Sequence, residues 1–171
     1  MSGHSKWSQI KHQKAITDKK RGQVFSKAAK LISLAARKGV NPENNLELRG
    51  AIDRAKSINV PNENIQRAIR RVSDKSSAQL EELLVEAIGP RNIAIQIKAV
   101  TDNRNRTISE LKKILADNNS KMVTPGSIAW MLNQPTIVAD PVFKEEIDKL
   151  FEALDDHDDV EEILSNITDQ S

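Results

Sequence analysis

The stretch LEELLVEAIGPRNIAIQIKAVT, residues 80–101, decides the fold class of this chain. Apolar residues alternate in steps of two over 80–88 and again over 92–101, whereas the preceding chain repeats in steps of three and four. Alternation of this kind is typical of half-buried strands, and the turn sequence Gly89-Pro90-Arg91-Asn92 separates the two segments. The stretch therefore predicts a β-hairpin.

The chain after this hairpin mixes both periods. Residues 107–117 return to helical spacing, and Asp140-Pro141 is typical of the start of a further helix with an apolar face. Short strands are predicted over 127–132, 136–139 and 160–167. From this order we expect a small α+β domain in which helices cover one face of a sheet.

The chain before the hairpin predicts three amphipathic helices with short connections, which make a small bundle. The first covers residues 22–38, the second follows the loop 40–45, and the third begins at Pro61 or Asn62. Residues 2–21 are rich in Lys and Arg, and we interpret them as a mobile arm or an exposed helix that orders on its partner. We expect two domains, residues 1–75 and 80–171, with a polar linker between them.

A net charge of +2 conceals a strong asymmetry between the two halves. Residues 1–75 hold 17 Lys or Arg and 6 Asp or Glu, a net +11, while residues 76–171 hold 9 and 18, a net −9. A basic half indicates contact with nucleic acid, although a lysine-rich helix can also have a merely solvated face. We expect the acidic half to face elsewhere.

Composition argues against an enzyme, a metal site and a cofactor site. The chain has no cysteine, which excludes disulfides and thiolate chemistry and fits a reducing compartment. Its 3 histidines are scattered, and neither a Gly-rich phosphate loop nor a nucleophile elbow occurs. The N-terminus does not resemble a secretory signal, and no apolar run approaches the roughly 20 residues that span a bilayer. We expect a cytoplasmic protein with no membrane partner and no small-molecule substrate.

The tract Thr101-Asp-Asn-Arg-Asn-Arg-Thr107 lies where a predicted strand ends and a predicted helix begins, a position that favours anions. Arg104 and Arg106 can hold phosphates there, while Asn103 and Asn105 bond to sugars or base edges. In the alternative interpretation Asp102 or Asn103 caps the helix, and the arginines are ordinary surface residues. The residues alone do not decide between these two interpretations.

The basic arm holds an isolated aromatic residue. Trp7 lies among Lys6, Lys11, His12 and Lys14. An exposed indole can stack on an unpaired base, which contributes roughly 1–3 kcal/mol per base, while lysines contact phosphate. The alternative is a Trp7 side chain buried against the helical bundle.

Motifs at both ends and in the middle of the chain resemble those of the YebC/PmpR family. The N-terminal signature is Gly3-His-Ser-Lys-Trp7 with Ile10-Lys-His12 and Phe25-Ser-Lys27. Similar motifs follow in order at residues 48–56, 61–69, 101–107 and 158–166. The resemblance implies a helical N-terminal domain, a ferredoxin-like α+β second domain and no enzymatic activity. Family members typically have a third domain, and this chain resembles a short variant without it, because residues 136–138 lead almost directly to Asp140-Pro141.

The resemblance leaves two functions open, a DNA-binding transcriptional regulator and a ribosome-associated translation factor that eases difficult stretches such as consecutive prolines. We see no helix-turn-helix pattern with a short Gly-containing turn, and a lysine-rich arm with an Arg/Asn tract suits irregular folded RNA. The sequence therefore favours ribosomal RNA, with duplex DNA as the alternative partner. A further alternative is a protein-interaction adaptor that acts through the acidic half. The expected nucleic-acid contacts are His4, Lys6, Trp7, Lys11, His12, Lys14, Lys19, Lys20, Arg21, Lys27, Asn103, Arg104, Asn105 and Arg106.

Overall fold

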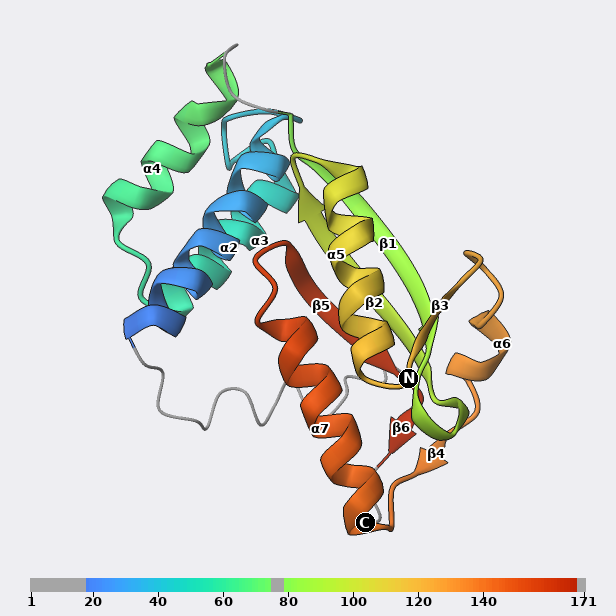
Figure 1. Cartoon of the computed structure of the whole chain (residues 1–171). Helices are drawn as coiled ribbons and strands as arrows, with labels where there is room; N and C mark the ends of the chain where they lie inside the picture. Colours follow the sequence, from blue (N-terminus) through green and yellow to red (C-terminus); the bar gives the residue numbers. More distant parts are fainter. Residues whose placement is uncertain (1–17, 75–78, 169–171) are drawn as a thin grey trace. The chain divides into compact units, whose positions relative to one another are not determined.

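The computed structural model describes residues 18–74 and 79–168. These residues form two compact units that divide between Glu81 and Glu82, a helical unit and an α+β unit (Figure 1). The α+β fold class predicted from the sequence is confirmed.

The helical unit holds the three predicted helices, α2 (Asp18–Ala36), α3 (Leu46–Ser57) and α4 (Asn62–Arg70), with a 3₁₀ turn, η1 (Arg71–Ser73), after α4 (Figure 1). Apolar residues at spacings of three and four bury one face of each helix, and both α3 and α4 pack against α2. The largest fully buried side chains at the centre are Ile32, Leu48 and Ile65. Because α2 begins at Asp18, residues 19–21 belong to its first turn rather than to the arm.

Asn45 fixes the connection between α2 and α3. Its side-chain oxygen accepts a hydrogen bond from the backbone N–H of Leu48 at 3.0 Å, which caps α3. Its Nδ2 atom donates to the carbonyl oxygens of Ala35 and Gly39, each at 2.8 Å. Gly39 has a φ of 149°, which other residues rarely adopt. The buried side-chain amide of Asn45 therefore provides hydrogen-bond partners for backbone groups both at the end of α2 and at the start of α3.

The α+β unit contains a sheet in the order β3-β1-β2-β5, and the helices α5 and α7 cover one face of it (Figure 1). The crossover from β2 through α5 to β3 passes over β1, which makes a split β-α-β unit like those of ferredoxin-like domains. In this unit the β1–β2 hairpin comes before the crossover. The elements are β1 (Glu81–Ile88), η2 (Pro90–Asn92), β2 (Ala94–Thr101), α5 (Arg104–Asp117), β3 (Lys121–Val123), α6 (Ala129–Leu132), β4 (Thr136–Ile137), α7 (Pro141–Asp155), β5 (Val160–Ser165) and β6 (Ile167–Thr168).

The predicted hairpin is β1 and β2, and its turn is tightly specified. The backbone N–H of Gly89 donates to the carbonyl oxygen of Ile93 at 2.9 Å. A Cβ atom at Gly89 would meet side-chain atoms of Ile93 and Ile95 at 2.7 and 2.8 Å. Arg91 and Asn92 turn the chain with φ values of 52° and 62°. A side chain at position 89 would therefore collide with the core under the turn.

The strand predicted over residues 127–132 is wrong. Turns lead instead into the short helix α6, and the reason is a buried carboxylate on the neighbouring strand. Glu86 of β1 is only 4% exposed and accepts hydrogen bonds from the backbone N–H groups of Gly126, at 2.8 Å, and Ile128, at 3.4 Å. These bonds hold the segment as a loop and bury Ile128, so the segment does not extend.

Two other strand predictions also need correction, and one of them is interrupted at Asn166. The strand predicted over 160–167 is broken there, because the Asn166 side chain accepts from the backbone N–H of Ala94 at 2.9 Å and donates to the carbonyl oxygen of Gln134 at 2.9 Å. The chain then continues as β6, which pairs in parallel with β4. The strand predicted over 136–139 is reduced to β4, and β3 was not predicted because three residues carry no measurable alternation.

Candidate nucleic-acid interface

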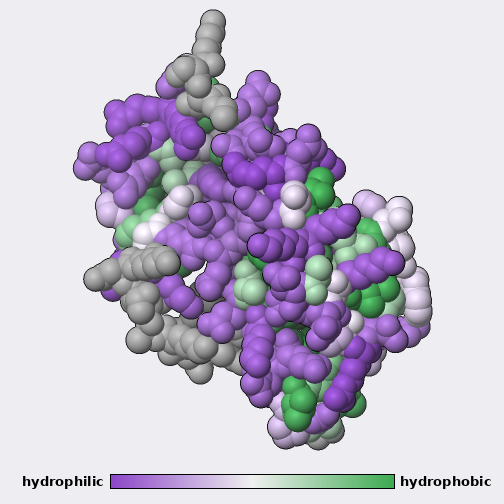
Figure 2. Space-filling view, in the orientation of Figure 1, coloured by the Kyte–Doolittle hydropathy of each residue, from purple (hydrophilic) through white to green (hydrophobic). Residues whose placement is uncertain are grey.

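Cationic side chains cover the outer faces of the helical unit. Most of them occupy helix positions outside the apolar stripes, and the others lie where α2 and α4 end, so they point away from the core. Figure 2 shows the surface over α4 as mainly hydrophilic. Some of these cations have partners within the unit, as in the exposed ion pair of Lys38 with Glu47 at 2.8 Å. The exposed Lys and Arg residues are Lys20, Arg21, Arg37, Lys38, Arg49, Arg54, Lys56, Arg67, Arg70 and Arg71.

Among the expected contacts on α2, Lys20 and Arg21 are exposed, but Lys27 is only 8% exposed. Position 27 adjoins the apolar stripe that includes Ala28 and Ile32, so its stem lies in the packed face of the helix. Lys27 is therefore less accessible than Lys20 and Arg21, and its role in binding stays a prediction.

Of the remaining expected contacts near the N-terminus, one lies within the described residues. Lys19 belongs to the first turn of α2. The others lie outside the described residues, and their role in binding stays a prediction. They are His4, Lys6, Trp7, Lys11, His12 and Lys14.

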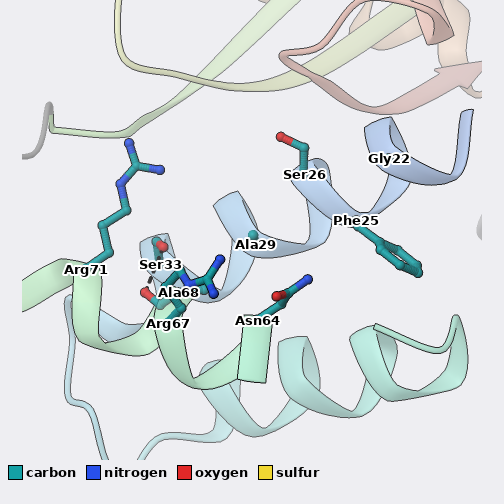
Figure 3. Close-up of a pocket in the computed structure, with 9 residues that line it drawn as sticks. All are labelled: Gly22, Phe25, Ser26, Ala29, Ser33, Asn64, Arg67, Ala68 and Arg71. Carbon is teal, nitrogen blue, oxygen red and sulfur yellow. Dashed lines mark hydrogen bonds between the residues drawn. The ribbon is translucent and has the colours of Figure 1, made fainter. Parts of the chain in front are cut away.

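A groove of about 390 Å³ runs between α2 and α4 (Figure 3). Its α4 side presents Asn64, Arg67 and, at the start of η1, Arg71. Both arginines are exposed, and Figure 3 shows their side chains extending from the same side of α4. Arg67 pairs with Glu63 at 3.2 Å, but the two side chains are 71% and 79% exposed, so solvent screens this pair. The groove therefore has one cationic wall.

The opposite wall of the groove consists of small residues on α2. Gly22, Ser26, Ala29 and Ser33 follow one another at intervals of four, three and four, and therefore lie on one side of the helix. The hydroxyl of Ser33 donates to the carbonyl oxygen of Ala68 at 2.8 Å, which ties α2 to α4 at the bottom of the groove. These short side chains leave the space that the groove occupies.

Sequence reasoning did not identify Arg67 and Arg71 as site residues. Two signals were available, the stripe of small residues on the first helix and the pair of arginines four positions apart on the third. Neither signal shows by itself that these two helix faces meet, because that depends on how α2 and α4 pack.

The tract at residues 101–107 forms the N-terminus of α5. Asn103 caps the helix, because its side-chain oxygen accepts from the backbone N–H of Arg106 at 3.1 Å. The guanidinium of Arg106 donates to Asp159 Oδ2 at 2.7 Å and lies 3.0 Å from Asp102 Oδ1. The hydrogen bond to Asp159 is the main reason that the pKa of Arg106 is raised. Arg106 is thus held within the unit.

A chain of hydrogen bonds continues from Asp159 into the core. Asp159 is 3% exposed, and its Oδ2 atom also lies 2.7 Å from the hydroxyl oxygen of Thr107, which is itself 2.7 Å from that of Thr101. An ionised carboxylate can only accept, so the Thr107 hydroxyl donates to it, which leaves the Thr101 hydroxyl to donate to Thr107. The backbone N–H of Asn103 then donates to Thr101 Oγ1 at 2.8 Å. The tract fastens α5 to the turn before β5, while Arg104 and Asn105 have exposed side chains.

Glu110, His157 and Asp159 present ligand atoms within 4.8 Å of one another. The groups already satisfy each other, because His157 Nε2 lies 2.8 Å from Glu110 and His157 Nδ1 accepts from the backbone N–H of Asp159 at 3.1 Å. Arg106 supplies a positive charge to the same carboxylates. This cluster is part of the hydrogen-bond network around Asp159, and we do not assign it to a metal ion. Within residues 18–74 and 79–168, no helix is both long and apolar enough to cross a membrane.

Comparison with known proteins gives consistent matches along the chain. The family model of the TACO1/YebC protein N-terminal domain matches residues 5–75, and that of the TACO1/YebC second and third domain matches residues 80–142. A probable transcriptional regulatory protein of Solibacter usitatus is 43% identical over 151 residues, which are 88% of this chain and 61% of that protein. One from Chloroflexus aurantiacus is 48% identical over 141 residues, 81% of this chain and 56% of that protein. The chain thus spans about three fifths of the length of these relatives.

The fold also matches a solved structure. The crystal structure of a conserved hypothetical protein, Aq1575 from Aquifex aeolicus, aligns with a TM-score of 0.84 and 27% sequence identity. The alignment covers 98% of each chain.

Proposed function

The chain belongs to the TACO1/YebC family, whose members are regulators without enzymatic activity, and we propose that it regulates gene expression by binding ribosomal RNA. In this proposal it is a cytoplasmic translation factor that eases synthesis of difficult stretches such as consecutive prolines. Residues 1–75 and 80–171 act as two domains, and the first one binds the RNA. Its contacts include the basic arm, Lys20 and Arg21.

The observation that carries the proposal is the spread of exposed cations over all three helices of the helical unit. A protein that reads duplex DNA usually presents base-reading side chains from one helix that enters the major groove. Cations on several faces instead suit an irregular RNA surface, where phosphates approach from several directions. The second unit is acidic, so its charge disfavours contact with the same phosphates.

One observation supports the alternative, a DNA-binding transcriptional regulator, which is also what the names of the relatives say of those proteins. Only residues 58–61 separate α3 from α4, and Asn59 turns with a φ of 62°. A short turn of this kind joins the helices of a helix-turn-helix, and Gln66, Arg67 and Arg70 lie exposed on the second helix. However, α3 and α4 pack mainly on α2 rather than on each other, so we favour RNA.

Co-sedimentation of the purified chain with ribosomes, at physiological salt and with excess duplex DNA as competitor, separates the two functions. Retention on the ribosome in the presence of DNA supports the translation factor. Removal by DNA, with no ribosome-bound fraction left, overturns it in favour of the transcriptional regulator. A variant with Lys11, Lys14, Lys19 and Lys20 replaced by alanine should bind more weakly, with a reduced dependence of log affinity on log salt concentration.

A further inference from the structure

We propose that the groove between α2 and α4 holds a single-stranded segment of RNA, with phosphates on Arg67 and Arg71 and a base or ribose over Phe25 and Ala29. The inference rests on the proposed function, because it names the part of an RNA that the helical unit binds. It adds a specific site, where the proposed function requires only a cationic surface.

The charge of the groove fits a phosphodiester backbone. Among the described residues that line it, two are arginines and none is acidic. Arg67 and Arg71 lie four positions apart, one helical turn or roughly 6 Å along the axis, so they can contact successive phosphates of one strand. Both side chains are exposed, so their guanidinium groups are accessible to a strand in the groove. The competing carboxylate, Glu63, is highly exposed and is easily displaced by a phosphate.

The position of the groove between two packed helices favours a single strand over a duplex. The axes of packed helices lie roughly 8–10 Å apart, so a surface groove between two of them is narrow. A double helix is wider than its own grooves, and the major groove of B-DNA is already about 12 Å wide. A whole duplex is therefore too wide to enter the space between two packed helices. A duplex can touch only the rims of such a groove, whereas an unpaired strand can lie along it.

The floor and rims supply contacts for the sugar and the base. Phe25 is half-buried at one end, and Ala29 continues the apolar surface (Figure 3). A Cβ atom at Gly22 would meet nothing within 4 Å, so the groove is open at this end. The exposed Ser26 hydroxyl and the half-buried Asn64 amide can bond with a 2′-hydroxyl or a base edge. Cations together with an apolar or aromatic platform are the usual combination in single-strand binding sites.

The charge contribution is tested with the double variant Arg67→Gln, Arg71→Gln. Its matched control is Arg49→Gln, Arg54→Gln, which removes the same charge from exposed positions of α3 that do not line the groove. Binding of the full chain to a labelled 12-mer of oligouridylate and to a 12-base-pair RNA duplex is measured by fluorescence anisotropy over a range of salt concentrations. We expect the groove variant to lose at least about tenfold more affinity for the single strand than the control, with a salt slope reduced by about 1.4 for two lost phosphates.

A second variant tests occupancy without changing charge. Ser26→Leu fills the groove from its rim, and Ser57→Leu places the same side chain at an exposed position on α3. We expect Ser26→Leu to weaken single-strand binding several-fold and to leave duplex binding unchanged, while Ser57→Leu changes neither. Circular dichroism melts of all variants verify that the helical unit is folded.

The outcomes separate the site from the function. Equal losses in the groove variant and its control, or equal losses on single strand and duplex, overturn the groove as a specific site but leave RNA binding by the helical unit in place. Unchanged single-strand binding in folded Ser26→Leu protein also overturns the groove. If the unaltered chain binds neither ribosomes nor either oligonucleotide, the proposed function itself fails.

Discussion

The hydroxyl of Thr107 donates a hydrogen bond of 2.7 Å to the carboxylate of Asp159, 52 positions later in the chain. Both residues are buried, with exposures of 0% and 3%. The bond joins the first turn of α5 to the turn that precedes β5, and Arg106 neutralises the same carboxylate from the solvent side. A tract that the sequence offered as a possible phosphate contact therefore has a structural role in the fold.

Replacing Arg106 with glutamine should destabilise the α+β unit, whereas Arg104→Gln should not. Loss of the guanidinium removes a charged hydrogen-bond donor from the buried Asp159 carboxylate, which we expect to lower the free energy of unfolding by about 1–3 kcal/mol. Arg104 is a surface residue, where substitutions usually change stability by less than about 0.5 kcal/mol. Urea unfolding followed by Trp130 fluorescence, in a Trp7→Phe background, measures this unit. Equal stabilities of the two variants would show that Asp159 does not depend on Arg106.

Thr107→Val should destabilise the same unit, and Thr107→Ser should retain most of the stability. Valine has nearly the shape of threonine but cannot donate to Asp159, so a buried acceptor loses a donor at an expected cost of about 1–3 kcal/mol. Serine keeps the hydroxyl and loses one methyl group, which costs roughly 0.8 kcal/mol when fully buried. The Trp130 fluorescence assay applies here too. A serine variant less stable than the valine variant would assign the role of Thr107 to packing rather than to its hydrogen bond.

Asn45→Ala should destabilise the helical unit more than Asn45→Asp. Alanine removes the cap of α3, worth about 1 kcal/mol, together with the two bonds to α2. Aspartate keeps the capping oxygen but cannot donate to the carbonyls of Ala35 and Gly39. Circular dichroism at 222 nm during urea unfolding reports the helices. If aspartate restored full stability, the bonds to the end of α2 would contribute nothing.

Asp140 should make the stability of the α+β unit depend on acid pH. Its pKa lies below the usual 3.8, first because of the Arg91 guanidinium bonded to it at 2.6 Å and then because of the backbone N–H of Val142. A lowered pKa means that this stabilisation is present above about pH 4 and is lost as pH falls through the folded-state value. Asp140→Asn should therefore lose less stability than the unaltered chain between pH 5 and pH 2. Parallel pH profiles of the two proteins would exclude Asp140 as a contributor.

Sequence periodicity was sufficient where local pattern and tertiary packing agree. The three helices and the β1–β2 hairpin follow from the spacing of apolar residues, and the α+β class follows from their order. The failures occur where a distant polar side chain determines the backbone. Glu86 holds residues 126–128 in a loop, and Asn166 ends β5 by bonding to Ala94. Nothing within the affected segments records these bonds.

The candidate site was predictable only as a property of one half of the chain. Charge asymmetry indicated the basic half. Of the expected contacts on α2, Lys20 and Arg21 are exposed and Lys27 is buried, a difference that charge alone does not predict. The helix cap at Asn103 was one of two open interpretations of its tract, and the geometry shows this cap. Arg67 and Arg71 become neighbours of the small residues on α2 only after α2 and α4 have packed.

The strand order β3-β1-β2-β5 also governs when each unit can form during synthesis. The helical unit has all its elements once residue 81 has left the ribosome, but β2 waits for β5, which ends at Ser165, 84 residues later. At about 5–20 residues per second, this delay is roughly 4–17 s. Limited proteolysis of ribosome-bound chains halted near residue 130 should therefore find the helices protected and the hairpin accessible. During that interval a nascent chain presents folded arginine-lined helices to the ribosome that is still making it.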